Sequence, residues 1–250
     1  RTQSDPLGIV FDYIRMIFHV DIIKYNSMID FLKSHTDDAY ALYEIIGQID
    51  CALSVDTELN SLREQNKPIC RADTGTEENF SAEDIYHPLL NNHVVNSISC
   101  SKNILLTGCN ASGKSTFLKC IVINAIFAQS FGFAFAKSYK APFYRIYSSM
   151  ALRDDIIAGE SYFMAEIKSI KRILDAADCD ENTSGEVSDV KILCVIDEVL
   201  RGTNTIERIC ASTEILKGLS RENVLVFAAT HDRELTKLLE AEYDNSHFSE

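Results

Sequence analysis

Residues 108–116 have the sequence GCNASGKST, which fits the phosphate-binding pattern G-x-x-x-x-G-K-[ST]. The apolar run NILLT, residues 103–107, predicts a short strand that enters this loop. The residues that follow, STFLKCIVINAIFAQ at 115–129, predict a helix. Strand, glycine-rich loop and helix in this order form the setting in which backbone N–H groups hold nucleotide phosphates. The stretch therefore predicts an α/β fold with a nucleotide site at the loop.

The loop pattern assigns a role to each of its defining residues. Gly108 and Gly113 allow the sharp turns that point successive N–H groups at the phosphates. Lys114 is expected to bridge phosphate oxygens, and the Ser115 hydroxyl is expected to bind Mg²⁺. A glycine-rich turn with an exposed lysine is the alternative. The predicted nucleotide-binding set is Gly108, Cys109, Asn110, Ala111, Ser112, Gly113, Lys114, Ser115 and Thr116.

Two later apolar runs end in polar side chains. KILCVID, residues 191–197, predicts a buried strand that ends at Asp197 and is followed by Glu198, and NVLVFAAT, residues 223–230, predicts a strand that leads to His231. Open α/β sheets bind ligands at the carboxyl ends of their strands. We therefore expect Asp197 to bind Mg²⁺, Glu198 to polarise the attacking water and His231 to contact the γ-phosphate. Adjacent acids also occur as plain surface charge, and a single histidine is often structural.

Taken together, the loop and the two strand ends predict an ATPase of the ABC type with Lys114, Glu198 and His231 as its catalytic residues. A small-molecule kinase is the competing enzyme class for such a loop. A kinase of that class would show an arginine-rich lid or a separate acceptor pocket, and neither is apparent in the sequence.

Composition and charge limit the partners of the chain. The 250 residues are 46% hydrophobic and carry a formal net charge of −13, without a run of lysine or arginine. Such a surface repels a phosphate backbone, so we expect no direct DNA binding by this segment. The eight cysteines form no C-x-x-C pair, which favours a reducing compartment, the cytoplasm, and neither disulfides nor a zinc site. The most apolar window, residues 121–136, is too short and too polar for a membrane span.

The sequence before the loop predicts a separate helical part. Apolar residues at spacings of three and four predict one helix over residues 8–33 and a second over 37–62. The residues SHTDD between them supply cap residues and a short turn, so we expect a helical hairpin within a lever or stalk segment at 1–70. The polar stretch 71–84 predicts a linker. Residues 85–250 predict a P-loop ATPase domain with a mostly parallel sheet flanked by helices.

Four blocks of the chain resemble, in the same order, the motif blocks of the ATPase domain of the MutS family, which lies within the ABC-type ATPase superfamily. The blocks are TGCNASGKSTFLKCIVINAIFAQSFGFAFA, SMALRDDIIAGESYFMAEIKSIKRIL, CVIDEVLRGTNT and FAATHDRELTKL. The stretches HPLL, SYFMAE and DEVLRGTNT are especially similar to a divergent MutS-related branch found mainly in bacteria. The strong resemblance covers residues 84–248, and residues 8–66 are more weakly similar to the lever helices that precede this domain in the family.

The resemblance implies further site residues. In the family a serine reaches the γ-phosphate of the partner subunit across a dimer, and Ser161 matches that position, with an ordinary helix cap as the alternative. An aromatic residue before the loop often stacks on adenine in the family, and the closest candidate here is His93. The loop at residues 203–205 matches one that faces the partner subunit. The family often has proline where Cys109 stands, a change that a loop acting through its backbone tolerates.

The resemblance implies an enzyme that hydrolyses Mg–ATP at composite sites in a homodimer and couples nucleotide state to DNA mismatch repair or a related DNA transaction. DNA would be bound by domains absent from these residues, because the family's mismatch-reading and DNA-clamping domains have no counterpart here. Its C-terminal helical dimerisation region has none either, so the ATPase domain is expected to be C-terminally truncated. The alternative is a nucleotide-gated module whose slow turnover times association with a protein or membrane partner, and the acidic surface favours it.

Overall fold

The structure is a computed structural model that describes residues 13–75, 77–90, 92–109, 112–150, 162–182, 191–200 and 203–248. It separates into two compact units, Arg1–Ser61 and Leu62–Glu250. The division falls inside the long helix α3, Thr36–Glu64. The predicted nucleotide-binding loop lies in the second unit.

The first unit consists of helices. α2 spans Val20–Ser34 and α3 begins at Thr36, and residues 13–17 are also helical. The predicted helices at 8–33 and 37–62 are therefore confirmed over their described residues, with an interruption at His19, whose φ of 50° is left-handed. Within this unit α2 buries no described side chain, and most of its apolar residues are exposed, among them Ile22, Ile23, Tyr25, Met28 and Phe31.

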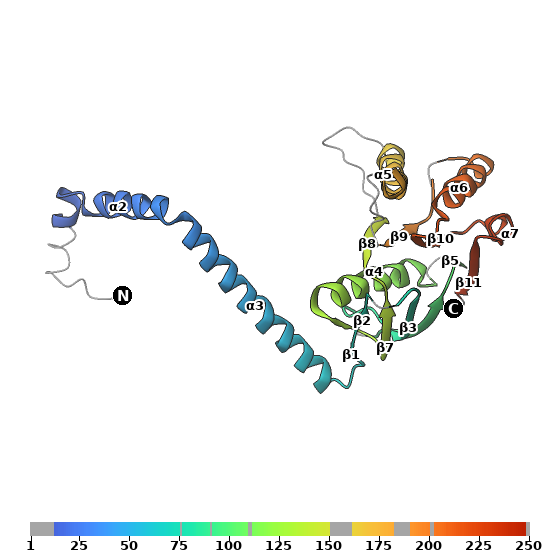
Figure 1. The fold of residues 1–250 in the computed structure, drawn as a ribbon, viewed down its shortest axis with the longest axis horizontal. Coiled ribbons are helices and arrows are strands. Elements are labelled where there is room, and N and C mark those ends of the chain that lie inside the picture. The colour runs from blue at the N-terminus through green and yellow to red at the C-terminus, as the bar shows by residue number, and fades with distance from the viewer. Residues whose placement is uncertain are drawn as a thin grey trace. The chain divides into compact units, whose positions relative to one another are not determined.

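The predicted hairpin between these two helices is wrong. Only His35 separates α2 from α3, and hydrogen bonds from His35 N to Phe31 O and from Ala39 N to His35 O keep the helical spacing across the junction. The hydroxyls of Ser34 and Thr36 donate back to carbonyl groups of the preceding turn. One residue leaves no room for the chain to reverse, and α2 and α3 follow one another end to end (Figure 1).

A parallel five-stranded sheet forms the centre of the second unit, in the order β11-β5-β10-β9-β8. Every neighbouring pair is parallel, which confirms the predicted parallel sheet. Its strands are β5 (Asn103–Gly108), β8 (Tyr144–Ser149), β9 (Lys191–Asp197), β10 (Val224–Ala229) and β11 (Tyr243–Phe248). The helices between them are α4 (Lys114–Phe131), α5 (Tyr162–Asn182), α6 (Thr205–Leu219) and α7 (Glu234–Leu238).

Two hydrophobic clusters cover the two faces of this sheet. Ile104 and Leu106 of β5 pack in one cluster with α4, whereas Leu105 packs in the other with α5, α6 and α7. Successive side chains of a strand point to opposite faces, so a sheet covered on both sides needs fully apolar strands. Figure 1 shows α4 and the shorter strands on one side of the sheet, and α5, α6 and α7 on the other.

A second sheet packs against the α4 side, in the order β2-β7-β3-β4. Its strands are β2 (Asp73–Thr74), β3 (Phe80–Ile85), β4 (Asn96–Cys100) and β7 (Ser138–Ala141), and β1 (Cys70–Arg71) pairs with β6 (Phe133–Ala134). The stretch 71–84, expected to be a linker, thus contributes strands to the domain. Its polar composition conceals the buried Phe80 and Ala82 of β3, and a register shift separates these two from the buried Ile85 at the end of the strand.

None of the helices in the described part of the chain combines the length and the apolar character that a membrane-spanning helix requires.

Candidate nucleotide-binding site

Three neighbouring strands of the parallel sheet end side by side. In register, Leu106 of β5 lies opposite Ala229 of β10, and Ala229 lies opposite Asp197 of β9. Hydrogen bonds from Thr230 N to Leu106 O, 2.9 Å, and from Glu198 N to Ala229 O, 3.0 Å, continue the pairing just beyond the strands. The predicted loop, the acidic pair and the predicted histidine therefore leave the sheet at one edge, although they are far apart in the sequence.

Glycine is required at both ends of the loop, for different reasons. Gly108 has a φ of 151°, and a Cβ atom there would lie 2.6 Å from Phe248 O and 2.9 Å from Ser112 Oγ. Gly113 has a φ of 95° and precedes α4, but a Cβ atom there would meet nothing within 4 Å. The first position is thus closed by its neighbours, whereas the second opens onto space that a ligand can enter. The predicted residues Asn110 and Ala111 lie outside the described residues.

Lys114 opens α4 and is 5% exposed. Its ammonium group donates hydrogen bonds to Gly108 O at 2.8 Å and to Cys109 O at 2.7 Å. The charge is therefore held over the loop, beside Ser115 and Thr116 in the first turn of the helix. The first N–H groups of a helix have no partner within it and carry the positive end of its dipole, so this helix start suits an anion.

The loop also contains a buried hydroxyl group, that of Ser112. Ser112 Oγ is inaccessible to solvent and has no hydrogen-bond partner among the described residues. Buried polar atoms are nearly always hydrogen-bonded, so an exception calls for an explanation such as a ligand. A phosphate oxygen near the loop would supply the missing partner.

The predicted acid and the predicted histidine contact one another. His231 Nε2 lies 2.6 Å from Glu198 Oε1, and His231 Nδ1 lies 3.2 Å from Gly108 O. A carboxylate and a carbonyl group are both acceptors, so both contacts are satisfied when each ring nitrogen carries a proton. One imidazole thus joins the acid at the end of β9 to the start of the loop. The other predicted acid, Asp197, is the last residue of β9.

The turn after the acidic pair has a backbone conformation that residues other than glycine rarely adopt. Glu198 and Leu200 are left-handed, with φ values of 62° and 58°. Glu166 of α5, which is 2% exposed, accepts a hydrogen bond from Leu200 N at 2.7 Å, and Ser212 Oγ of α6 donates to Val199 O at 3.4 Å. The two neighbouring helices therefore hold the turn in place.

Glu166 was not among the predicted site residues, although the sequence carried a signal for it. It precedes Ile170 and Ile173 by four and seven residues, which places it on the buried face of the helix. A charged residue on a buried face must be paired, because burying an uncompensated charge is costly. Ser161, predicted to act on the partner subunit, lies outside the described residues.

A cavity of about 470 Å³ adjoins the loop. Ser112, Gly113 and Thr116 form its loop side, and the rest of its lining is mainly apolar or aromatic: His87, Leu90, Asn92, Val94, Asn96, Phe117, Cys120 and Phe248. Burial, and then the positive charge of Lys119, lowers the pKa of His87 from its ordinary value. The position and the lining of this cavity suit the base and sugar of a nucleotide.

His93, the residue predicted to stack on adenine, does not line this cavity. Its ring packs on Tyr86, with the ring centroids 4.3 Å apart and the planes inclined by 30°. Its Nδ1 atom is buried and has no hydrogen-bond partner among the described residues. The stacking role of His93 stays a prediction, and His87 is the histidine that lines the cavity.

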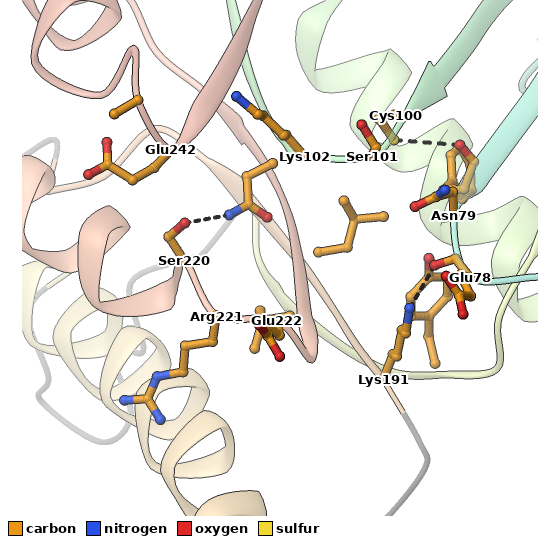
Figure 2. A pocket seen from close by; sticks show the side chains of 16 residues that line it. Glu78, Asn79, Cys100, Ser101, Lys102, Lys191, Ser220, Arg221, Glu222 and Glu242 are labelled. Atoms are coloured by element: carbon orange, nitrogen blue, oxygen red, sulfur yellow. Dashed lines mark hydrogen bonds between the residues drawn. The ribbon is translucent and has the colours of Figure 1, made fainter.

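A second cavity, of about 390 Å³, lies at the opposite edge of the sheet, where β5, β9 and β10 begin (Figure 2). Its basic side chains are largely engaged: Lys191 donates to Glu78 O at 2.7 Å, and Arg221 donates to Ala177 O at 3.0 Å. The acids Glu78, Glu222 and Glu242 line the same cavity. It is therefore separate from the predicted nucleotide site and poorly suited to an anion.

Comparison with known proteins identifies the family. The family model of MutS domain V matches residues 104–249, which is more than half of the 250-residue chain. The chain belongs to the MutS family. The match to MutS domain V begins in β5 and contains the loop, both strand ends and Ser161, and only His93 among the predicted site residues precedes it.

Curated relatives extend the similarity to the helices before this domain. The DNA mismatch repair protein MutS of Fervidobacterium nodosum is 31% identical over 225 residues, 86% of this chain and 25% of that protein. MutS of Thermus aquaticus is 34% identical over 136 residues, 54% of this chain and 15% of that protein. MutS protein homolog 4 of Saccharomyces cerevisiae is 27% identical over 230 residues, 89% and 24% respectively. The chain spans about a quarter of these relatives' length or less.

Proposed function

We propose that this MutS domain V is a P-loop ATPase of the ABC type that binds and hydrolyses Mg–ATP. One observation carries the proposal: the loop with Lys114, the acidic pair at the end of β9 and His231 after β10 converge at one edge of a parallel sheet. In open α/β sheets this edge is where ligands bind. Parallel strands alone would place polar residues there, but not a lysine and a histidine that both contact Gly108 O, with Glu198 against that histidine.

The residues present fit a nucleotide. Phosphates suit the closed turn at Gly108, the open approach at Gly113 and the helix start at Lys114. A phosphate oxygen would also give the buried Ser112 hydroxyl a hydrogen-bond partner. The adjoining cavity would hold adenosine, with His87 or His93 as the aromatic partner of the base. Bound Mg²⁺ would neutralise phosphate charge, and Ser115 and Asp197 are the residues that would hold it.

The other residues then have distinct roles in hydrolysis. Lys114 would shift its hydrogen bonds from Gly108 O and Cys109 O to phosphate oxygens, because a phosphate is a stronger acceptor than a carbonyl group. Glu198 would orient and polarise the attacking water. His231, whose nitrogens face Glu198 and Gly108 O, would donate to the γ-phosphate and so report its presence to the acid.

We propose further that hydrolysis takes place at composite sites in a homodimer. The loop pattern supplies one cation, Lys114, on one side of the γ-phosphate, and phosphoryl transfer usually uses a second group on its far side. Ser161 of the partner subunit would supply a hydroxyl and a helix start there. Glu198→Gln keeps the shape of the side chain and removes the base, so sedimentation should show an ATP-dependent dimer that persists. An ATP-independent monomer in this variant would contradict the proposal.

The relatives named as DNA mismatch repair proteins suggest the wider role. We propose that nucleotide state is coupled to a DNA transaction, mismatch repair or a related process, through domains outside these residues. The rival is a nucleotide-gated module that binds a protein or membrane partner, and the net charge of −13 with the exposed apolar residues of α2 favours it. Stimulation of the full-length protein's ATPase by duplex DNA would support the first role, and indifference to DNA the second.

Calorimetry on a pair of matched lysine variants tests the nucleotide site. Lys114→Ala removes the buried ammonium at the loop, and Lys119→Ala removes an exposed one from the same helix. Lys114→Ala should weaken binding of ADP by a factor on the order of ten to a hundred, since charge-assisted hydrogen bonds contribute about 1.5–3 kcal/mol. Lys119→Ala should leave the affinity nearly unchanged. Equal ADP affinities in all three proteins would show that the loop is not the site.

A further inference from the structure

A half-buried ion pair lies next to the predicted catalytic residues. Arg208 Nε donates to Asp232 Oδ2 at 2.8 Å and Arg208 Nη2 donates to Asp232 Oδ1 at 2.7 Å, and the two side chains are 24% and 13% exposed. Two parallel hydrogen bonds between a guanidinium group and a carboxylate fix the orientation of both groups. Solvent screens a pair of this exposure less than it screens a surface salt bridge.

The pair joins the start of α6 to the turn that carries His231. Arg208 lies in the first turn of α6, which follows the turn after Glu198, and Asp232 comes directly after His231. Asn204 fixes the start of α6, because its side chain accepts from Glu207 N at 3.0 Å. Asp232 N in turn donates to Thr230 Oγ1 at 3.1 Å, which closes the turn around His231. The end of β10 is thereby tied to a rigid helix start.

The same two side chains border a small cavity at the predicted base. The cavity has a volume of about 220 Å³ and is lined by Glu198, Val199, Arg208, Thr230, His231 and Asp232. Hydrogen bonding to Asp232 raises the pKa of Arg208 and is the largest effect; burial, the next largest, lowers it, and the negative charges of Asp232 and then Glu198 raise it. The guanidinium charge therefore acts on both carboxylates that face this cavity, one of which contacts His231.

We propose that Arg208 and Asp232 form a positioning pair that holds the His231 imidazole between Glu198 and the Gly108 carbonyl. The proposal rests on the proposed ATPase function of the site. Contacts of 2.6 Å and 3.2 Å from the two ring nitrogens leave little tolerance, so rotation of the 230–232 turn would break at least one of them. No hydrogen bond joins either residue to the described part of the loop that is proposed to bind phosphate. Their loss should thus lower turnover and spare the affinity for ADP.

Steady-state hydrolysis by the full chain tests this, with Arg208→Ala, Asp232→Ala, the double variant and Arg208→Lys. Misplacing a reacting group by about 1 Å can slow catalysis about a hundredfold, so we expect kcat to fall between about tenfold and a hundredfold in each alanine variant. The affinity for ADP should stay within about twofold of the parent, since binding at the loop is untouched and ADP has no γ-phosphate for His231 to contact. The double variant should be no slower than either single one. Arg208→Lys keeps the charge without the planar fork and should recover only part of kcat.

Arg221→Ala is the matched control for stability. Arg221 pairs with Asp178 just beyond the other end of α6 and lines the cavity at the opposite edge of the sheet. Arg221→Ala should lower the melting temperature about as much as Arg208→Ala does, and it should leave kcat unchanged. An unchanged kcat in Arg208→Ala, or an equal loss of kcat in Arg221→Ala, would overturn the proposal.

A spectroscopic measurement separates this proposal from the proposed function. If the parent protein hydrolyses no ATP, the ATPase assignment fails, and the imidazole NMR signal of His231, assigned with His231→Gln, then decides whether the pair positions the ring. That signal should move or broaden in Arg208→Ala and Asp232→Ala but not in Arg221→Ala. An unmoved signal in both pair variants would overturn the positioning role whatever the activity.

Discussion

Replacing Glu166 is expected to release the turn that follows the proposed catalytic acid. Glu198 and Leu200 both have left-handed backbone conformations, and each costs roughly 1–2 kcal/mol for a residue other than glycine. The hydrogen bond from Leu200 N to the buried Glu166 carboxylate offsets this, because a hydrogen bond to a charged group contributes about 1.5–3 kcal/mol. The strain and the hydrogen bond are of similar size. The bond to Glu166 therefore helps to keep the turn in its strained shape, together with the bond from Ser212 Oγ to Val199 O.

Two substitutions at this position separate the hydrogen bond from the charge. Glu166→Ala should lower the free energy of unfolding by about 2–4 kcal/mol, from the lost hydrogen bond and the space left in the core. Glu166→Gln keeps an oxygen acceptor for Leu200 N and should lower it by only about 1 kcal/mol, the difference between a charge-assisted and a neutral hydrogen bond. Lys171→Ala, on the exposed side of the same helix, should change it by less than about 0.5 kcal/mol.

Urea unfolding followed by circular dichroism measures these differences, since the chain has no tryptophan to report by fluorescence. Hydrogen exchange at the Leu200 amide should accelerate in Glu166→Ala and stay slow in Glu166→Gln. ATP turnover should follow the same order, whereas ADP affinity should stay near that of the parent. A Glu166→Ala protein with parental stability and a protected Leu200 amide would refute this account of the turn.

Two further predictions concern the loop. Gly113→Ala should lower the free energy of unfolding by about 1–2 kcal/mol, because alanine is strained at this positive φ. Gly108→Ala should lower it by about twice as much, because its Cβ atom would also meet Phe248 O. Thermal unfolding compares the two variants, and equal losses would contradict the closed geometry at Gly108. Burial raises the pKa of Cys100, Cys120 and Cys194 to about 12, so near neutral pH iodoacetamide should spare them and label the exposed thiols of Cys51, Cys109 and Cys210. Mass spectrometry should show that ADP protects Cys109 and leaves Cys51 labelled, and equal labelling with and without ADP would count against nucleotide binding at the loop.

The central strands of the fold could be predicted because burial on both faces requires apolar residues along their whole length. β5, β9 and β10 are covered on both faces, so each appears as a continuous apolar run between turns. β11 could not be predicted in this way. It lies at the edge of the sheet, and of its residues Tyr243–Phe248 only Tyr243 is buried, so its sequence resembles a polar tail. In the second sheet β2 and β7 have too few residues for a period to be read, and a register shift between Ala82 and Ile85 interrupts the alternation of β3.

The site residues also fall into two groups, those that a local sequence pattern predicts and those that only the fold brings together. Lys114, Glu198 and His231 follow strands within a few residues, so local motifs predict them and the sheet brings them together. The Arg208–Asp232 pair and the hydrogen bond from Leu200 to Glu166 join residues 24 and 34 positions apart on separate elements. Nothing local specifies which partner such a side chain meets, because that choice depends on how the helices cover the sheet. Motifs therefore predict the groups proposed to act on the nucleotide, and only the fold reveals those that hold them.

The Gly108 carbonyl connects the two halves of the proposed site. It accepts a hydrogen bond from Lys114 Nζ at 2.8 Å and lies 3.2 Å from His231 Nδ1, while the other nitrogen of His231 contacts Glu198. A phosphate that draws the ammonium group away from this carbonyl leaves it a freer acceptor for His231, and a γ-phosphate competes for the same imidazole. Either change alters the contact between His231 and Glu198, which is held on one side by the Arg208–Asp232 pair and on the other by Glu166 through the 198–200 turn. Binding of a phosphate at the loop would thus change the contacts of Glu198, the proposed base, through the Gly108 carbonyl oxygen and without movement of the sheet.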